Sequence, residues 1–197
     1  MADNHLFPVF FKVDRLHVLV VGGGHVGLEK VSALLSNCPT ASLTIVATWF
    51  RPELDALVKD YPHVTLVQKA FSCGDLFGKD LVIAATNDHE LNVQIWEKAR
   101  SCKVLINVAD TPELCDFYLG SVVQKGNLKI AISTNGKSPT VAKRLRQVLQ
   151  ECLPDSLDQV LEKLHLIRNR LTGDFNAKVE KLNALTDVLV ENETEKH

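Results

Sequence analysis

The sequence has 197 residues, of which 46% are hydrophobic and 23% charged, and its formal net charge is −2 at neutral pH. This composition is typical of a globular chain that buries a core, and the small net charge provides no basic field for nucleic acid. No apolar run reaches the ~18 residues that a membrane helix needs. Five cysteines without a C-x-x-C pair favour neither a disulfide framework nor a zinc knuckle. We therefore expect a cytoplasmic protein without a signal peptide, a resident metal, a nucleic-acid partner or a membrane anchor.

Strand-like and helix-like segments alternate over the first 110 residues. Apolar runs predict strands, and amphipathic segments between them predict helices. Such alternation is typical of a Rossmann-type parallel sheet with right-handed crossovers. The expected strands are residues 16–21, 43–47, 64–68, 80–85 and 104–108, and the expected helices are 28–36, 52–59 and one that Asn87-Asp88 caps and that runs to about 101.

The pattern changes after Asp110. Residues 117–124 and 128–133 are strand-like and are joined by a turn-forming Lys125-Gly126-Asn127, which predicts a β-hairpin. Ser138-Pro139 then has the chemistry of a helix start, and the chain is helical in pattern from there onward. We expect an α/β nucleotide-binding domain over residues 1–112, a small hairpin module over 113–150 and a helical C-terminal region over 151–197.

The first expected strand ends in a G-x-G-x-x-G motif formed by Gly22, Gly24 and Gly27. In the strand–turn–helix context this motif predicts dinucleotide binding. Gly22 allows the tight turn, Gly24 lets the backbone approach a pyrophosphate, and Gly27 lets the helix pack closely on the strand. The alternative is a glycine turn with a structural role only.

Polar residues follow the expected strands, where ligands bind in open parallel sheets. Asn87 and Asp88 follow the fourth expected strand, and for them the alternative to ligand binding is capping of the next helix. No acidic residue directly follows the second strand to repel a 2′-phosphate, so the motif does not distinguish NAD from NADP. The candidates at the strand ends are Asn107 for substrate binding and, for cofactor binding, His25 and Val26, Thr48 and Trp49, and Thr86 and Asn87.

Asp110 follows the fifth expected strand, near the nicotinamide end of a Rossmann cleft. A carboxylate there can direct a proton during hydride chemistry, although Asp before Thr-Pro is also good turn chemistry. A second polar group, Thr134, Lys137 and Ser138, precedes a basic helix. Hydroxyls, free N–H groups and cations at a helix start suit anionic ligands such as carboxylates, while an ordinary capped helix is the alternative.

Several of these motifs, in this order, resemble the precorrin-2 dehydrogenase/sirohydrochlorin ferrochelatase family, which is also the N-terminal module of bacterial siroheme synthase. The resemblance spans about residues 6–170. The residues that carry it are Phe7-Pro8-Val9-Phe10, the glycine motif Val21–Gly27, Leu81–Asp88, Asn107–Pro112, Phe117–Ser121 and Ser133–Pro139.

The resemblance implies NAD-dependent oxidation of precorrin-2 to sirohydrochlorin in siroheme biosynthesis, and in some members Fe²⁺ insertion to give siroheme. It also implies a homodimer formed through the hairpin module. Asp110 matches the family's key aspartate, and His25, Val26, Thr48 and Trp49 match its nucleotide contacts. Relatives often have alanine where Gly27 stands, and we expect the fold to tolerate either residue.

Two alternatives remain open. One is a chelatase whose nucleotide site is vestigial, which the complete glycine pattern argues against. The other is an NAD(H)-sensing regulatory module, which requires a partner-binding element. The segment Lys143-Arg144-Leu145-Arg146 is a short candidate for such an element.

Overall fold

The computed structural model describes residues 4–171 and 175–186. The chain forms two compact units, Met1–Leu119 and Gly120–His197. Within the described residues, no helix is both long enough and apolar enough to cross a lipid bilayer.

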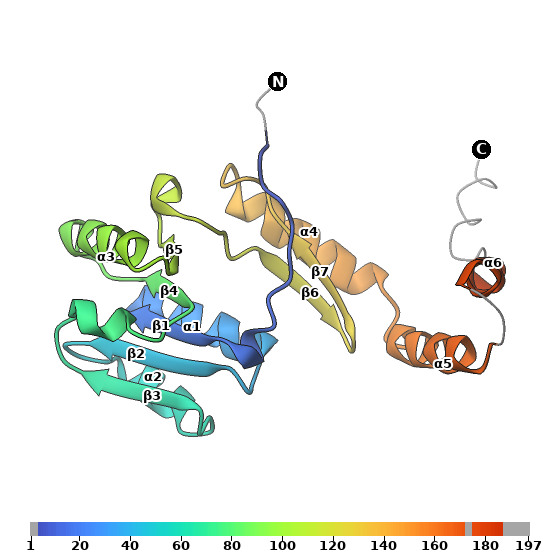
Figure 1. Cartoon of the computed structure of the whole chain (residues 1–197), viewed down its shortest axis with the longest axis horizontal. Helices are drawn as coiled ribbons and strands as arrows, with labels where there is room; N and C mark the ends of the chain where they lie inside the picture. Colours follow the sequence, from blue (N-terminus) through green and yellow to red (C-terminus); the bar gives the residue numbers. More distant parts are fainter. Residues whose placement is uncertain (1–3, 172–174, 187–197) are drawn as a thin grey trace. The chain divides into compact units, whose positions relative to one another are not determined.

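The first unit is built on a five-stranded parallel sheet with the strand order β3-β2-β1-β4-β5 (Figure 1). The central strand β1 pairs with β2 on one side and with β4 on the other, so that Val20 lies opposite both Ile45 and Ile83. The strand order therefore reverses at β1, which makes the carboxyl end of β1 the topological switch point. The strands are β1 (His17–Val21), β2 (Ser42–Ala47), β3 (Val64–Gln68), β4 (Leu81–Ala84) and β5 (Leu105–Val108).

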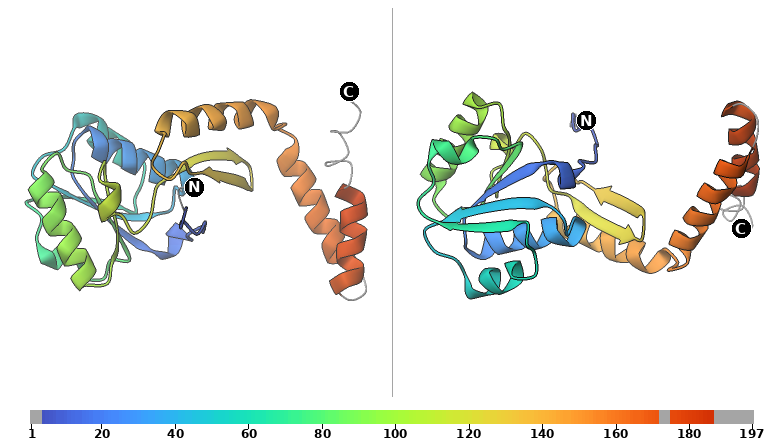
Figure 2. Two further views of the ribbon diagram at one scale, coloured as in Figure 1. Left: turned by 90° about the horizontal axis from the view of Figure 1, so that it is seen from above. Right: turned by 60° about the horizontal axis from the view of Figure 1, so that its bottom comes forward.

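Helices cover both faces of this sheet, which confirms the Rossmann-type prediction (Figures 1 and 2). Helices α1 (His25–Asn37) and α2 (Pro52–Val58) pack on one face through Leu35 and Leu54, which are fully buried. Helix α3 (His89–Ser101) and the short 3-10 helix η2 (Cys73–Leu76) cover the other face through Ile95 and Leu76. Burial on both faces explains the continuous apolar runs of the central strands β1 and β4. Two further 3-10 turns are η1 (Val13–Arg15) and η3 (Pro112–Leu114).

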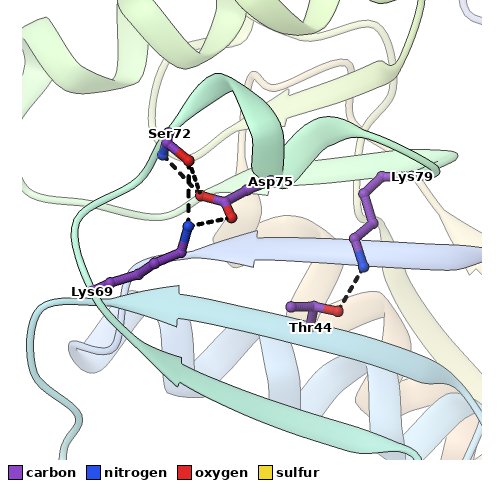
Figure 3. A network of polar contacts seen from close by, with 5 residues as sticks. All are labelled: Thr44, Lys69, Ser72, Asp75 and Lys79. Carbon is purple, nitrogen blue, oxygen red and sulfur yellow. Dashed lines mark hydrogen bonds and ion pairs between the residues drawn. The ribbon is translucent and has the colours of Figure 1, made fainter.

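A polar network fixes the connection from β3 to β4, where η2 replaces a full crossover helix (Figure 3). Asp75 and Ser72 form a capping box, and Asp75 also receives an ion pair of 2.6 Å from Lys69. Partial burial alone would raise the pKa of Asp75, but the hydrogen bonds from Lys69 and Ser72 outweigh it and lower the pKa. Lys79 donates to the Thr44 hydroxyl on β2 at 2.6 Å.

Over its described residues, the second unit contains a two-stranded antiparallel hairpin and three helices (Figure 2). The turn of the hairpin includes Gly126 at φ +55°, a backbone conformation that favours glycine. Asp158 accepts a hydrogen bond from the Asn127 backbone at 2.7 Å, so a later helix of the unit holds the hairpin turn. The elements are β6 (Ser121–Lys125), β7 (Leu128–Ile132), α4 (Pro139–Cys152), α5 (Leu157–Arg170) and α6 (Phe175–Thr186).

Two element boundaries differ from the predictions by three residues or more. Helix α1 begins at His25 rather than at residue 28, because Gly24 already occupies the N-cap position and the end of the glycine motif is helical. Strand β6 begins at Ser121 rather than at residue 117, since β7 offers only five partners and Ser121 pairs with its last residue. Residues 172–174 and 187–197 of the expected helical region lie outside the described residues.

Candidate dinucleotide site

The loop between β1 and α1 is shaped by two glycines that have no room for a side chain. Gly22 has φ +126°, and a Cβ there would lie 2.3 Å from the Ala85 carbonyl oxygen. A Cβ on Gly27 would lie 2.1 Å from the Gly22 carbonyl oxygen. The expectation that alanine is tolerated at Gly27 is therefore wrong for this chain, because the obstructing atoms belong to the backbone of the same loop. Both glycines bring α1 close to the strand ends.

Gly24 differs from these two, because no atom lies within 4 Å of the position that a Cβ would take. Its backbone is extended (φ −82°, ψ −162°), and it caps α1 without a side-chain hydrogen bond to the first turn. The first-turn N–H groups of a helix have no partners within the helix and carry partial positive charge. The predicted contacts Gly24, His25 and Val26 thus present open space and uncapped amides at the switch point, the surroundings that a dinucleotide pyrophosphate requires.

The carboxyl end of β2 lies against this glycine loop. A Cβ on Gly23 would lie 2.2 Å from the Trp49 carbonyl oxygen, and the Arg51 amide donates to the Gly23 carbonyl at 3.0 Å. The predicted nucleotide contacts Thr48 and Trp49 are both exposed at this place. An acidic side chain also stands here, since Glu53 folds back onto Arg51. Glu53 is not among the predicted contacts, because those were the positions directly after the strand.

Thr86 and Asn87 follow β4 on the other side of the switch point. The Thr86 hydroxyl donates to Oδ1 of Asn92 at 2.7 Å, and Nδ2 of Asn92 donates to the Thr86 carbonyl at 3.1 Å. Asn92 is buried on α3, so this pair fixes the β4 end to the helix. Asp88 caps α3 by accepting from the Leu91 amide at 3.0 Å, whereas Asn87 is exposed. Capping is therefore the role of Asp88, and Asn87 stays a candidate for binding.

Asp110 is exposed at the end of β5 and has φ +58°, a left-handed conformation that is uncommon for residues other than glycine. The turn that carries it is fixed on both sides. The Ala109 amide donates to the Ala84 carbonyl of β4 at 2.9 Å, and the Thr111 amide donates to the Val108 carbonyl at 3.3 Å. A strained conformation held by its surroundings is common at functional sites.

Asn107 and Cys115 hold the segment around Asp110 in place. Asn107 is only 6% exposed, and its Nδ2 donates to the Phe117 carbonyl at 2.8 Å. The Sγ of Cys115 accepts from the Val108 amide at 3.2 Å. Burial raises the pKa of the Cys115 thiol, so it is neutral at pH 7. The side chain of Asn107, predicted to bind substrate, is thus engaged in supporting the turn, and no motif in the sequence pointed to Cys115.

The remaining candidates, Thr134, Lys137 and Ser138, lie together in the loop between β7 and α4 of the second unit. The Thr134 hydroxyl accepts from the Ser138 amide at 3.1 Å, and the Ser138 hydroxyl accepts from the Val141 amide at 3.2 Å. Gly136 has φ +74°, which allows the tight turn. Both hydroxyls therefore cap the start of α4, and each keeps its O–H as a donor for an anionic group.

The structure brings most of the first-unit candidates to one edge of the sheet, because the carboxyl ends of parallel strands meet there. The edge combines uncapped helix amides, exposed polar side chains and the carboxylate of Asp110. Among residues 4–171 and 175–186, no three His, Cys, Asp or Glu side chains are grouped to hold a metal ion.

Comparisons with known proteins agree with this geometry. A family model described as putative NAD(P)-binding matches residues 9–121, and a model described as the central part of a sirohaem biosynthesis protein matches residues 125–151. A solved structure of SirC, a precorrin-2 dehydrogenase, superposes with a TM-score of 0.70 at 25% identity, covering 91% of this chain and 89% of that one.

Curated relatives are longer than this chain. The siroheme synthase of Psychrobacter cryohalolentis is 38% identical over 176 residues, which are 89% of this chain and 32% of that protein. The siroheme synthase of Pseudoalteromonas atlantica is 33% identical over 183 residues, or 93% of this chain and 39% of that protein. The chain thus spans about a third of the length of these relatives. Because the first family model covers more than half of the sequence, the chain belongs to the family of putative NAD(P)-binding proteins.

Proposed function

We propose that the protein oxidises precorrin-2 to sirohydrochlorin with NAD⁺ as the hydride acceptor, as a step of siroheme biosynthesis. The observation that carries the proposal is the likeness to a precorrin-2 dehydrogenase over nine-tenths of both chains. The open glycine loop at the switch point supports it, because Gly24 leaves space for the pyrophosphate.

The residues of the first unit would act by binding and positioning the two reactants. The amides of His25 and Val26 would hold the pyrophosphate at the start of α1, and Thr48 and Trp49 would border the adenosine half. Thr86 and Asn87 follow the next strand, toward the nicotinamide half. When bound, the nicotinamide supplies the hydride acceptor, and the protein's contribution is alignment.

Asp110 is the proposed catalytic residue. Oxidation of the ring removes a hydride and releases a proton, which an exposed carboxylate can accept at the site. The hydrogen bonds of both neighbouring amides hold the backbone that carries the Asp110 carboxylate.

The second unit is proposed to bind the anionic substrate. Precorrin-2 carries eight carboxylates, and the Thr134 and Ser138 hydroxyls together with Lys137 offer donors at the start of α4. Asn107 contributes by supporting the Asp110 turn. We further propose a homodimer formed through the hairpin module, with domains over residues 1–112, 113–150 and 151–197.

A second activity, insertion of Fe²⁺ as a substrate, is favoured by the same carboxylate. Metal insertion must remove two pyrrole protons, and Asp110 is exposed to accept them without a fixed metal cage. The alternatives of a vestigial nucleotide site or of a regulatory NAD(H) sensor predict no NAD-dependent turnover.

Anaerobic absorbance spectroscopy of the purified protein tests these activities. With precorrin-2 and NAD⁺ we expect the sirohydrochlorin spectrum to appear only when both protein and NAD⁺ are present. Adding Fe²⁺ then tests the chelatase, which should exceed the protein-free rate. NAD⁺ binding without any spectral change would contradict the dehydrogenase and favour the sensor.

A further inference from the structure

The start of α2, just after β2, carries a two-point ion pair between Arg51 and Glu53. Nη2 of Arg51 lies 2.9 Å from Oε1 of Glu53, and Nε donates to Oε2 at 3.2 Å. Both oxygens of the carboxylate are thus occupied by one guanidinium, the arrangement that Arg adopts with carboxylates and phosphates alike. The hydrogen bond from Arg51 lowers the pKa of Glu53, so the carboxylate is ionised at neutral pH.

This pair stands beside the glycine loop. The Arg51 amide donates a hydrogen bond to the Gly23 carbonyl at 3.0 Å, which ties the start of α2 to that loop. In dinucleotide-binding folds, the end of the second strand is where an acidic residue meets the ribose hydroxyls, or where an arginine accommodates the 2′-phosphate of NADP. Here both residue types, Arg51 and Glu53, are present shortly after the second strand, and they are bound to each other.

The lysines of the neighbouring segment are held elsewhere. Lys69, directly after β3, is bound by Asp75 and Ser72, and Lys79 donates to Thr44 (Figure 3). Arg51 is therefore the cation near this strand end that could release its partner Glu53 and bind a phosphate instead. Its partner Glu53 is exposed, and an exposed ion pair is weak enough to be altered by one substitution.

We propose that the Arg51–Glu53 pair sets the preference of this site for NAD over NADP. Glu53 holds the guanidinium that would otherwise bind the 2′-phosphate, and its charge repels that phosphate. Removing the carboxylate frees Arg51 for the phosphate. The inference rests on the proposed function only in that the site binds a nicotinamide dinucleotide.

The test compares the dissociation constants of NAD⁺ and NADP⁺ by calorimetry for the full chain and its variants. Glu53→Gln should strengthen NADP⁺ binding about tenfold, the scale of a charge-assisted hydrogen bond, and change NAD⁺ binding far less. Arg51→Gln should keep NAD⁺ binding and weaken NADP⁺ binding further, because the carboxylate then stands alone. The double variant should lose the gain in NADP⁺ binding. Glu97→Gln on α3 is the control, since it removes the same charge on the opposite face of the sheet.

An unchanged NADP⁺ to NAD⁺ ratio in Glu53→Gln, with NAD⁺ binding intact, would overturn this inference and leave the proposed function standing. A gain that persists in the double variant would also overturn it, because Arg51 would then not be the phosphate ligand. Should Glu53→Gln fail to fold, an unaltered NADP⁺ affinity in Arg51→Gln would overturn the inference equally. If the unsubstituted protein bound neither nucleotide, the proposed function itself would fail, and this inference with it.

Discussion

Replacing Gly24 by alanine should weaken nucleotide binding strongly while leaving the fold intact. The backbone of Gly24 is extended, and a Cβ would meet no atom within 4 Å, so the protein itself offers no clash. Replacing glycine by alanine at a compatible backbone position raises the free energy of unfolding by about 0.4–1 kcal/mol, because the unfolded chain then has less conformational freedom. At an N-cap, alanine lowers the free energy of unfolding by a similar amount, because it caps a helix poorly. The two effects nearly cancel.

The melting temperature of Gly24→Ala should therefore stay within about 2–4 °C of the unsubstituted protein, the shift that 1 kcal/mol causes in a chain of this size. Nucleotide binding should nevertheless weaken by at least about tenfold, or about 1.4 kcal/mol, because the methyl group occupies the space assigned to the pyrophosphate. Thermal denaturation and calorimetry with NAD⁺ measure both quantities on one sample.

Gly74→Ala is the matched control, because its Cβ would also be free, with Ser72 Oγ at 3.8 Å as the nearest atom. This variant should keep both its melting temperature and its NAD⁺ affinity. Unchanged NAD⁺ affinity in Gly24→Ala would refute the reasoning, since the pyrophosphate would then not pass over that residue. A large loss of stability would refute the claim that the space is open.

The same geometry supports three further predictions. Gly27→Ala should lower the free energy of unfolding by about 1–3 kcal/mol, the range for overpacking, because its Cβ would lie 2.1 Å from the Gly22 carbonyl oxygen; denaturant titration checks this, and a neutral result would show that the loop can yield. Asp110→Ala should keep NAD⁺ affinity and lose turnover of precorrin-2 by about 10²–10⁴-fold, the share that a general base contributes; loss of NAD⁺ binding in calorimetry would instead place Asp110 in the cofactor site. Asp75→Asn should cost about 1 kcal/mol at neutral pH through the lost ion pair with Lys69 and the weakened capping box. Because the pKa of Asp75 is lowered in the folded state, the difference in stability between Asp75→Asn and the unsubstituted protein should be complete above about pH 4 and disappear as pH falls through the folded pKa. Equal stability of the variant and the unsubstituted protein at about pH 7 would contradict this prediction.

Local rules explain why much of the first unit could be predicted. The central strands β1 and β4 have continuous apolar runs because both faces of the sheet are covered there, and the prediction of β3 agrees with the structure at both ends. The capping roles of Asp88 and Ser138 follow from short-range chemistry and are confirmed.

What could not be predicted depends on how a loop folds back on itself. The tightness around Gly27 comes from the backbone of Gly22 within a folded loop, and the support of Asp110 by Cys115 depends on how η3 returns to β5. Glu53 lies inside a helix pattern, so its sequence position suggested only a first-turn acid. Only the fold shows that it faces Arg51 beside the glycine loop.

In its proposed catalytic role, Asp110 would trade stability for function, because its backbone is left-handed. That conformation is less unfavourable for aspartate than for most residues, but glycine adopts it without a Cβ penalty, so glycine in its place would remove the remaining cost. Selection for thermodynamic stability alone would favour glycine at this position. A carboxylate kept at this backbone angle would therefore serve the proposed proton transfer rather than the fold, and variants chosen only for thermal tolerance should be the ones that lose it.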